Sequence, residues 1–93
     1  MNLTDKATIP DSVMARQVGD ETVILDLASG TYFGLDAVGA RMWQLMSEGH
    51  TLLQVCEGVL AEYDADRVDV ERDVLALASD LLAKGLIADA RLE

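Results

Sequence analysis

The sequence predicts one α+β domain of the winged helix-turn-helix-like kind, in which a three-stranded antiparallel sheet is followed by three helices. The chain has 93 residues, of which 51% are apolar and only 4% aromatic, so it can build one compact aliphatic core. Apolar residues recur at every second position in the first half of the chain and at helical spacing in the second half. Strand and helix patterns do not alternate along the chain, which argues against a parallel α/β sheet.

Three short segments of the first half have the composition of strands. They cover residues 13–18, 22–27 and 31–35, and they are separated by Gly19-Asp20 and Ala28-Ser29-Gly30, which are typical turn sequences. The segment 22–27 is almost continuously apolar and rich in β-branched residues, which predicts a central strand. Short connections favour antiparallel neighbours, so the other two segments are expected at the edges of the sheet.

Helical spacing of the apolar residues predicts three helices after the sheet. The first begins at Asp36, a suitable N-cap, and ends at Gly49. The second begins with Thr51-Leu52-Leu53-Gln54, which has the form of a capping box. The third is expected to begin at Asp69 as its N-cap and to run to Lys84.

The two ends of the chain are expected to lie outside this domain. Residues 1–12 contain the only proline, Pro10, and show little alternation, which predicts a flexible N-terminal arm. We expect the domain itself over residues 13–88 and a C-terminal tail over 89–93. No apolar run approaches the roughly 18 residues of a membrane span and no signal peptide is recognised, so a cytoplasmic location is expected by default.

The charge of the chain restricts its partners. It has 17 Asp and Glu against 7 Lys and Arg, a formal net charge of −10, and such a surface repels nucleic-acid phosphates and anionic lipids. The third helix, which would read DNA in a winged-helix regulator, carries four acids and two bases: Asp69, Glu71, Asp73, Asp80, Arg72 and Lys84. We expect neither nucleic acid nor membrane as a partner, and a DNA-binding regulator stands as an alternative from another class.

Few residues have the chemistry of a catalytic or metal site. His50 lies at a helix start and Cys56 within the apolar stripe of the second helix, so the two lie on different faces and form no nucleophile pair. One His and one Cys cannot complete a zinc site, and the connector acids Asp64, Asp66 and Asp69 lack the glycine and glutamate of an EF-hand loop. We therefore expect no enzyme activity, no cofactor and no metal.

Two features favour peptide binding instead. The third helix is apolar over a wide arc, which indicates burial on two sides, a homodimer interface, or a face that binds another polypeptide. The segment 31–35, as an edge strand, carries no Lys or Pro that would block pairing. An extended peptide can add to residues 31–34 and lay alternate side chains against the third helix, which is β-augmentation.

Four stretches of the chain follow the pattern of one known family. They are residues 26–43, 48–51, 60–63 and 82–87. In this order and spacing they resemble PqqD-like peptide-recognition domains, the recognition elements (RREs) of pathways that make ribosomally synthesised and post-translationally modified peptides (RiPPs). The resemblance covers about residues 13–88.

The resemblance implies a winged-helix-like fold that captures the leader region of a precursor peptide and presents it to separate enzymes. The chain is more similar to the stand-alone leader-binding proteins of lasso-peptide pathways, which work with a leader peptidase and an ATP-dependent cyclase. PqqD proper, the chaperone that serves a radical SAM enzyme in quinone cofactor synthesis, is the alternative. Its pattern has a Tyr-Pro-Glu stretch and an Asn-based helix start where this chain has Thr31-Tyr32-Phe33-Gly34-Leu35-Asp36.

On this hypothesis nine residues bind the leader between the third strand and the third helix. The pairing edge is expected to consist of Thr31, Tyr32, Phe33 and Gly34. The apolar wall is expected to consist of Val70, Val74 and Leu77. Asp73 is expected to bind a polar or basic residue of the leader, and Arg72 an acidic one. A structural dimerisation module, in which a second copy covers the apolar helix face, is the other alternative.

Overall fold

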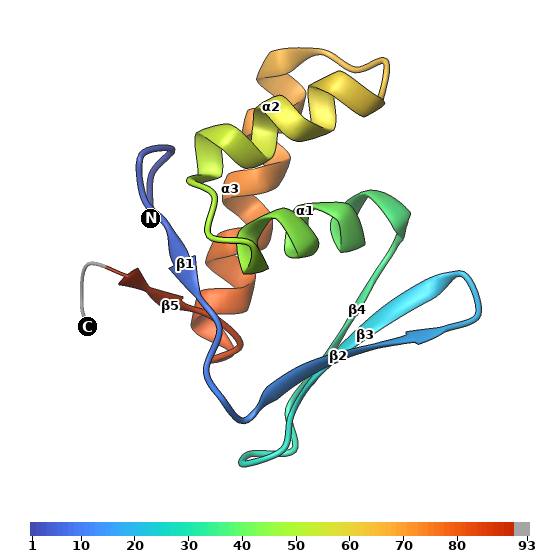
Figure 1. Ribbon diagram of the computed structural model, residues 1–93, viewed down its shortest axis with the longest axis vertical. Coiled ribbons are helices and arrows are strands. Elements are labelled where there is room, and N and C mark those ends of the chain that lie inside the picture. The colour runs from blue at the N-terminus through green and yellow to red at the C-terminus, as the bar shows by residue number, and fades with distance from the viewer. Residues whose placement is uncertain (91–93) are drawn as a thin grey trace.

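The computed structural model describes residues 1–90 and confirms the α+β fold, with a three-stranded antiparallel sheet followed by three helices (Figure 1). The strands of this sheet lie in the order β2-β3-β4, with β2 at Val13–Val18, β3 at Glu21–Asp26 and β4 at Tyr32–Leu35. In the register of the sheet, Leu25 of β3 lies opposite Met14 on one side and Tyr32 on the other. As predicted, β3 is central and the other two strands form the edges.

The three helices follow in chain order: α1 (Ala37–Ser47), α2 (Leu52–Glu62) and α3 (Arg67–Ala83). The predicted starts of the first two are confirmed, because Asp36 accepts the Gly39 N–H at 2.8 Å and Thr51 forms a capping box with Gln54.

The start of α3 differs from the prediction. Its N-cap is Asp66, whose carboxylate accepts the Val68 N–H at 3.1 Å, and not Asp69. Both aspartates have the right chemistry, but capping at Asp66 adds most of a turn of helix. It also places Asp69 in the first turn, where its negative charge is favourable at the positive end of the helix dipole.

Residues 1–12 also differ from the loose arm that the sequence predicts. The two-residue strand β1 (Ala7–Thr8) pairs antiparallel with β5 (Ala88–Asp89) and forms a second sheet. Upstream of β1, the carbonyls of Asp5 and Leu3 accept the N–H groups of Leu52 and Leu53 at 2.9 and 2.8 Å. These N–H groups lie in the first turn of α2 and have no partner within the helix, so the N-terminal segment satisfies them.

The C-terminal segment takes part in this second sheet through β5. The predicted tail over 89–93 begins inside β5, and its residues 91–93 lie outside the described part of the chain. Strands of two residues are too short to produce a readable period, which explains why the sequence pattern does not reveal this second sheet.

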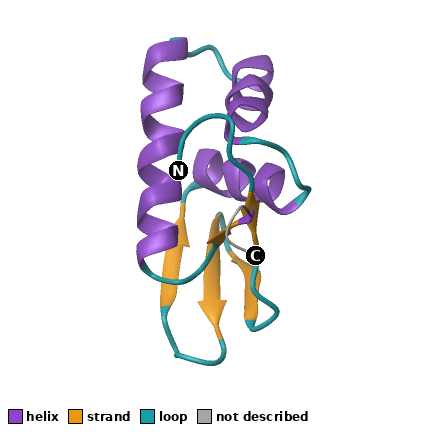
Figure 2. Ribbon diagram, turned by 90° about the vertical axis from the view of Figure 1, so that its left-hand side faces the viewer, coloured by secondary structure: helices purple, strands orange, loops and turns teal. Residues whose placement is uncertain are grey.

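One hydrophobic core joins the helices to the inner face of the sheet. Its fully buried side chains include Ile24 of β3, Met46 of α1, Leu52 of α2, and Val74 and Leu81 of α3. The domain is flat, 36 × 34 × 19 Å, and Figure 2 shows the helices packed above the sheet, with α3 standing along one side. Within residues 1–90, no helix is long and apolar enough to cross a membrane.

Candidate functional site

β4 is an edge strand with one open side. Among the described strands it pairs with β3 alone. Its side chains alternate between the two faces of the sheet, with Leu35 buried, Phe33 half-buried and Tyr32 72% exposed. Tyr32 therefore points to the outer face of the sheet, while Phe33 and Leu35 point toward the helices.

The backbone groups on this open side belong to Tyr32 and Gly34. The Thr31 carbonyl accepts the Asp26 N–H at 2.8 Å, so it points toward β3. Hydrogen-bonded and non-hydrogen-bonded pairs alternate along an antiparallel ladder, and the backbone groups of Tyr32 and Gly34 therefore point away from β3. Of the four predicted edge residues, only these two can pair with an added strand, because Thr31 and Phe33 pair inward.

The turn that leads into β4 is built around Asp26. Its carboxylate accepts the Ala28 N–H at 3.0 Å and the Ser29 hydroxyl at 2.9 Å. Hydrogen bonds from Ser12, from the Ala28 N–H and from Ser29 hold the pKa of Asp26 below its ordinary value. Gly30 completes the turn with a φ of 76°, which other residues rarely adopt. The ionised carboxylate of Asp26 therefore orders the turn that precedes β4.

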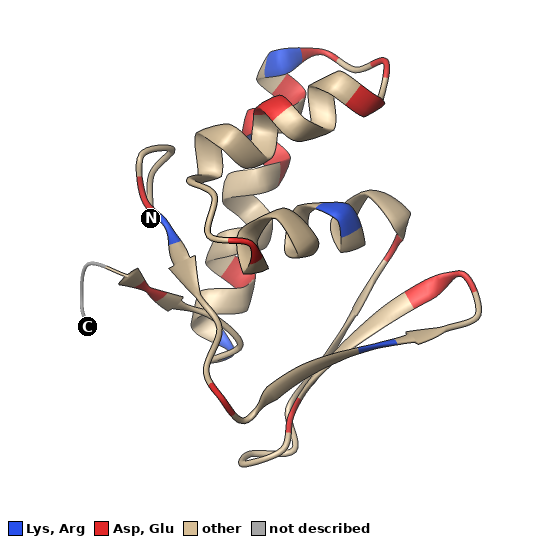
Figure 3. Ribbon diagram, viewed as in Figure 1, with Lys and Arg blue, Asp and Glu red and all other residues tan. Residues whose placement is uncertain are grey.

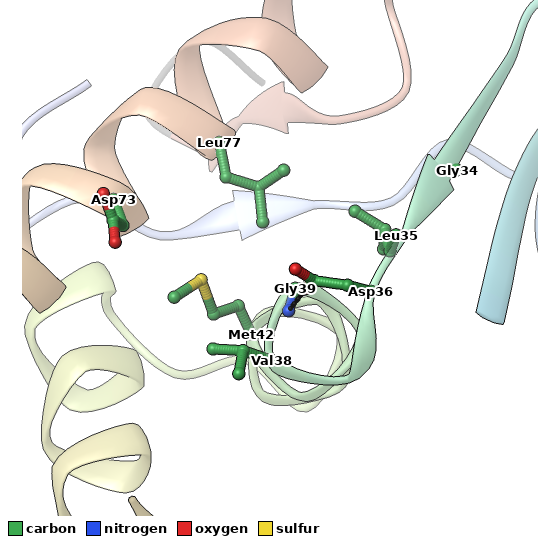
Figure 4. Close-up of a pocket in the computed structure, with 8 residues that line it drawn as sticks. All are labelled: Gly34, Leu35, Asp36, Val38, Gly39, Met42, Asp73 and Leu77. Carbon is green, nitrogen blue, oxygen red and sulfur yellow. Dashed lines mark hydrogen bonds between the residues drawn. The ribbon is translucent and has the colours of Figure 1, made fainter. Parts of the chain in front are cut away.

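A groove lies between β4, the beginning of α1 and α3, and we call it the β4–α3 groove. It has a volume of about 430 Å³ and is lined by Gly34, Leu35, Asp36, Val38, Gly39, Met42, Asp73 and Leu77. Figure 4 shows Leu77 reaching from α3 toward Val38 and Met42 of α1. Leu35, Val38, Met42 and Leu77 contribute apolar side chains to the lining, and Asp36 and Asp73 contribute carboxylates.

The junction between β4 and α1 is tight because of Gly39. A Cβ at this position would lie 3.2 Å from Asp36 Oδ1 and 3.3 Å from Leu35 Cδ2. A small residue therefore lets the first turn of α1 approach the end of β4. This approach places Val38 in the groove.

α3 carries the predicted wall residues at different depths. Val74 is fully buried and Val70 is only 4% exposed, so both belong to the core and not to an exposed wall. Leu77 is half-buried and lines the groove together with Asp73. Asp73 and Leu77 are one helical turn apart and share a face, whereas Val70 and Val74 occupy the neighbouring face that meets the core.

The two charged residues of the predicted site, Asp73 and Arg72, differ in their position relative to the groove. Asp73 lines the groove, and its side chain is 62% exposed. Arg72 does not line it, and its guanidinium lies 3.1 Å from the Asp69 carboxylate and 3.6 Å from that of Asp73. Arg72 is therefore placed to neutralise its neighbours on α3, and its contact with an acidic residue of the leader stays a prediction.

The prediction missed the contribution of the β4–α1 junction. Leu35, Asp36, Val38 and Met42 all line the groove, and none of them was among the predicted binding residues. One signal for their position is present in the sequence. Asp36 as N-cap with Gly39 three residues later indicates a helix whose first turn lies close against the preceding strand.

Neither Cys56 nor His50 lines the groove. Cys56 is fully buried, and burial raises the pKa of its thiol, so the neutral form is favoured. His50 lies near the surface, with Nε2 3.6 Å from the Glu48 carboxylate. Over residues 1–90, no group of three or more His, Cys, Asp or Glu is arranged to hold a metal ion.

Two solved structures share this fold over most of the chain. TbiB1 in complex with the TbiA(beta) leader peptide is 44% identical, with a TM-score of 0.78, over 86% of this chain and 93% of that one. Lasso peptide synthetase B1 complexed with the leader peptide is 29% identical, with a TM-score of 0.80, over 89% of this chain and 98% of that one.

Curated relatives and a family match agree with these structures. The PqqA binding proteins of two strains of Rhodopseudomonas palustris are 32% and 30% identical over 56 residues, which are 60% of this chain. The same residues are 55% of those proteins, so the chain spans about half the length of the curated relatives it matches. Residues 21–87 match the family described as Coenzyme PQQ synthesis protein D (PqqD). The chain therefore belongs to the PqqD family.

Proposed function

We propose that this protein binds the leader region of a ribosomally synthesised precursor peptide and presents that peptide to separate enzymes, without making or breaking a bond itself. The leader adds to β4 as a fourth strand, and the side chains on one of its faces enter the β4–α3 groove. In this mode of binding, main-chain hydrogen bonds give affinity and side-chain pockets give selectivity.

The observation that carries this proposal is the open edge of β4 beside a groove. Tyr32 and Gly34 direct their backbone groups away from β3, and the groove lies between this strand and α3. Side chains alternate along an added strand, so every second one points toward Leu77 and Met42. The two structural relatives described above are both complexes with a leader peptide, which supports the same occupant here.

A lasso-peptide pathway is the setting that the relatives favour. Lasso peptide synthetase B1 shares the fold over 89% of this chain and over 98% of its own length. We propose a leader peptidase and an ATP-dependent cyclase as the enzymes served, and the cytoplasm, where the precursor is translated, as the location. The match of residues 21–87 to PqqD favours a second candidate, a chaperone for a radical SAM enzyme in quinone cofactor synthesis.

The two alternatives from other classes have less support. A DNA reader needs an excess of cations on its recognition helix, but residues 69–84 carry four acids against two bases. A dimerisation module would use an exposed apolar face of α3, but its main apolar residues are buried in the core. The exposed apolar side chains lie mostly on the outer face of the sheet instead, where Met14, Val18 and Leu27 are 43%, 58% and 65% exposed.

Fluorescence anisotropy tests the proposal. The probe is a labelled synthetic leader of the precursor encoded beside this gene, titrated with the protein at low and high salt, with a scrambled leader as the control. We expect saturable binding near micromolar or tighter, about −8 kcal/mol or better. Failure to bind any neighbouring leader would contradict the proposal, and steeply salt-dependent binding to duplex DNA would support the regulator instead.

A further inference from the structure

The β4–α3 groove continues into a second pocket at the beginning of α3. This pocket has a volume of about 520 Å³ and shares Val38, Met42 and Asp73 with the groove. It extends to the end of α2 and to the connector that follows it, where Tyr63 and Asp64 line it. Because the two cavities have walls in common, a single extended peptide can occupy both.

The second pocket combines carboxylates with an aromatic ring. Among residues 1–90, four aspartates line it and no Lys or Arg does: Asp64, Asp66, Asp69 and Asp73. Figure 3 shows acidic positions gathered at the end of the molecule where α2 leads into α3. Tyr63, which is 38% exposed, lines the same pocket. Carboxylates bind a Lys or Arg side chain by charge-assisted hydrogen bonds, and a ring beside them adds a cation–π contact.

The ion pairs already present do not block this role. Arg72 pairs with Asp69 and Asp73, but its side chain is 68% exposed and it does not line the pocket. Ion pairs between exposed side chains contribute little free energy, so a cation that arrives with a bound peptide can replace them.

A positive charge lies at the other end of α3 from these carboxylates. Lys84, the C-cap of α3, has its Nζ 5.9 Å from the centre of the Phe33 ring of β4, and neither residue lines the groove or the second pocket. A peptide that extends along β4 into the second pocket therefore has a cation near Phe33 and four carboxylates near Asp73. Such a difference can distinguish one direction and register of the peptide from another, because a misplaced charge faces a like charge.

We propose that the second pocket receives a Lys or Arg side chain of the leader, adjacent to the segment that pairs with β4, and that this contact fixes the register of the leader. The inference rests on the leader-binding function proposed above and adds to it a requirement for a basic residue. A long cationic side chain fits the site better than a metal ion, since the described carboxylates are not grouped for metal coordination.

A charge-matched pair of variants tests the inference. The test variant is Asp64→Asn/Asp69→Asn/Asp73→Asn, which keeps Asp66 as the N-cap of α3. The control variant is Asp11→Asn/Asp20→Asn/Asp80→Asn, which removes the same number of charges from exposed positions outside the pocket. The probes are the labelled neighbouring leader and copies in which each Lys and Arg is replaced in turn by Gln. Circular dichroism and urea unfolding check that each variant is folded.

We expect the test variant to bind the leader about tenfold more weakly at low salt and the control variant to bind within about twofold of the wild type. One Gln-substituted leader should bind the wild-type protein about tenfold more weakly than the unchanged leader does. The test variant should bind the two leaders equally, because in a double-mutant cycle the second substitution has no effect once a direct contact has been removed. Unchanged binding by the test variant, or an equal loss in the control variant, overturns the inference and leaves the proposed function intact. Absence of binding by the wild type overturns both.

Discussion

The ammonium group of Lys84, the C-cap residue of α3, lies 5.9 Å from the centre of the Phe33 ring of β4. This cation–π contact joins the last turn of the helix to the strand whose other side is open. At the opposite end of the strand, Asp36 and Gly39 hold the beginning of α1 against β4. Contacts at both ends thus set the separation between the strand and the helices that form the groove.

Replacing the cation should loosen this connection. We expect Lys84→Gln to lower the free energy of unfolding by about 0.5–1 kcal/mol, because the cation–π contact is lost near the surface. Urea unfolding of Lys84→Gln, Phe33→Leu and the double variant measures the coupling. If the two single effects add, the residues do not interact and the interpretation is wrong.

Proline at Gly34 should separate peptide binding from folding. The Gly34 N–H faces the open side of β4, so Gly34→Pro removes a donor for the leader but none for β3. We expect the affinity for the leader to fall by about tenfold or more, roughly the loss of one or two main-chain hydrogen bonds.

Two variants serve as controls for the proline substitution. Gly34→Ala should bind normally, because its Cβ meets no atom within 4 Å and the N–H is kept. Phe33→Pro removes an N–H that faces β3 and should unfold the protein at lower urea concentration. Equal binding by Gly34→Pro and Gly34→Ala would rule out pairing at this edge.

Neighbouring residues of α3 should have different effects. Val74→Ala should lower the free energy of unfolding by about 2 kcal/mol, because Val74 is fully buried, with little direct effect on binding by the folded protein. Leu77→Ala should weaken leader binding more than it weakens the fold, because Leu77 is half-buried and lines the groove. Calorimetry with the leader and urea unfolding of both variants measure the two effects. The reverse ranking would place the binding face of α3 at Val74.

The turn before β4 should make stability depend on pH in acid. Hydrogen bonds from Ser12, Ala28 and Ser29 lower the pKa of Asp26 in the folded state. The stabilisation is therefore present above the pKa of the unfolded chain and is lost as the pH falls through the lower folded value, in the range below about pH 4. Asp26→Asn should reduce this dependence in urea unfolding at pH 3 and pH 7, whereas Asp20→Asn at the β2–β3 turn should not. Parallel curves for Asp26→Asn and wild type would contradict the assignment.

Removing residues 1–6 should destabilise α2. The deletion takes away the carbonyls of Leu3 and Asp5, which accept the N–H groups of Leu53 and Leu52, and the carbonyl of Lys6, which accepts the Ala90 N–H. We expect a loss of about 3 kcal/mol in the free energy of unfolding, at about 1 kcal/mol for each of these three hydrogen bonds. Thermal unfolding measures it, with Lys6→Ala as a control that keeps the backbone. An unchanged melting temperature would show that the segment contributes nothing to the domain.

The parts of the fold that the sequence predicted are those with long, regular patterns. The alternation of 31–35, the apolar run of 22–27 and the caps at Asp36 and Thr51 each depend on neighbours within a few residues, and the structure bears them out. The pairing of β1 with β5 joins residues from opposite ends of the chain and has no local signal. The choice between Asp66 and Asp69 as N-cap was undecidable from propensity alone, because both are aspartates.

The candidate site was predicted at the level of its elements but not of all its side chains. The edge strand was identified from its place in the predicted strand order, and α3 was identified from its apolar composition. Which ridge of α3 faces outward depends on how the helix is rotated against the core, and that rotation buries Val74 and leaves Leu77 at the groove. The part played by α1 depends on the close approach at Gly39, which is a tertiary contact.

The pairing of Ala7–Thr8 with Ala88–Asp89 places the first and the last strand of the described chain side by side. Proteins whose first and last elements lie side by side tolerate circular permutation, because a short linker can join the ends without crossing the molecule. New ends at Gly19-Asp20, in the turn between β2 and β3, would leave the open side of β4 untouched. A peptide fused to such an end could then be delivered to the groove from a different direction than one attached beside β1 or β5.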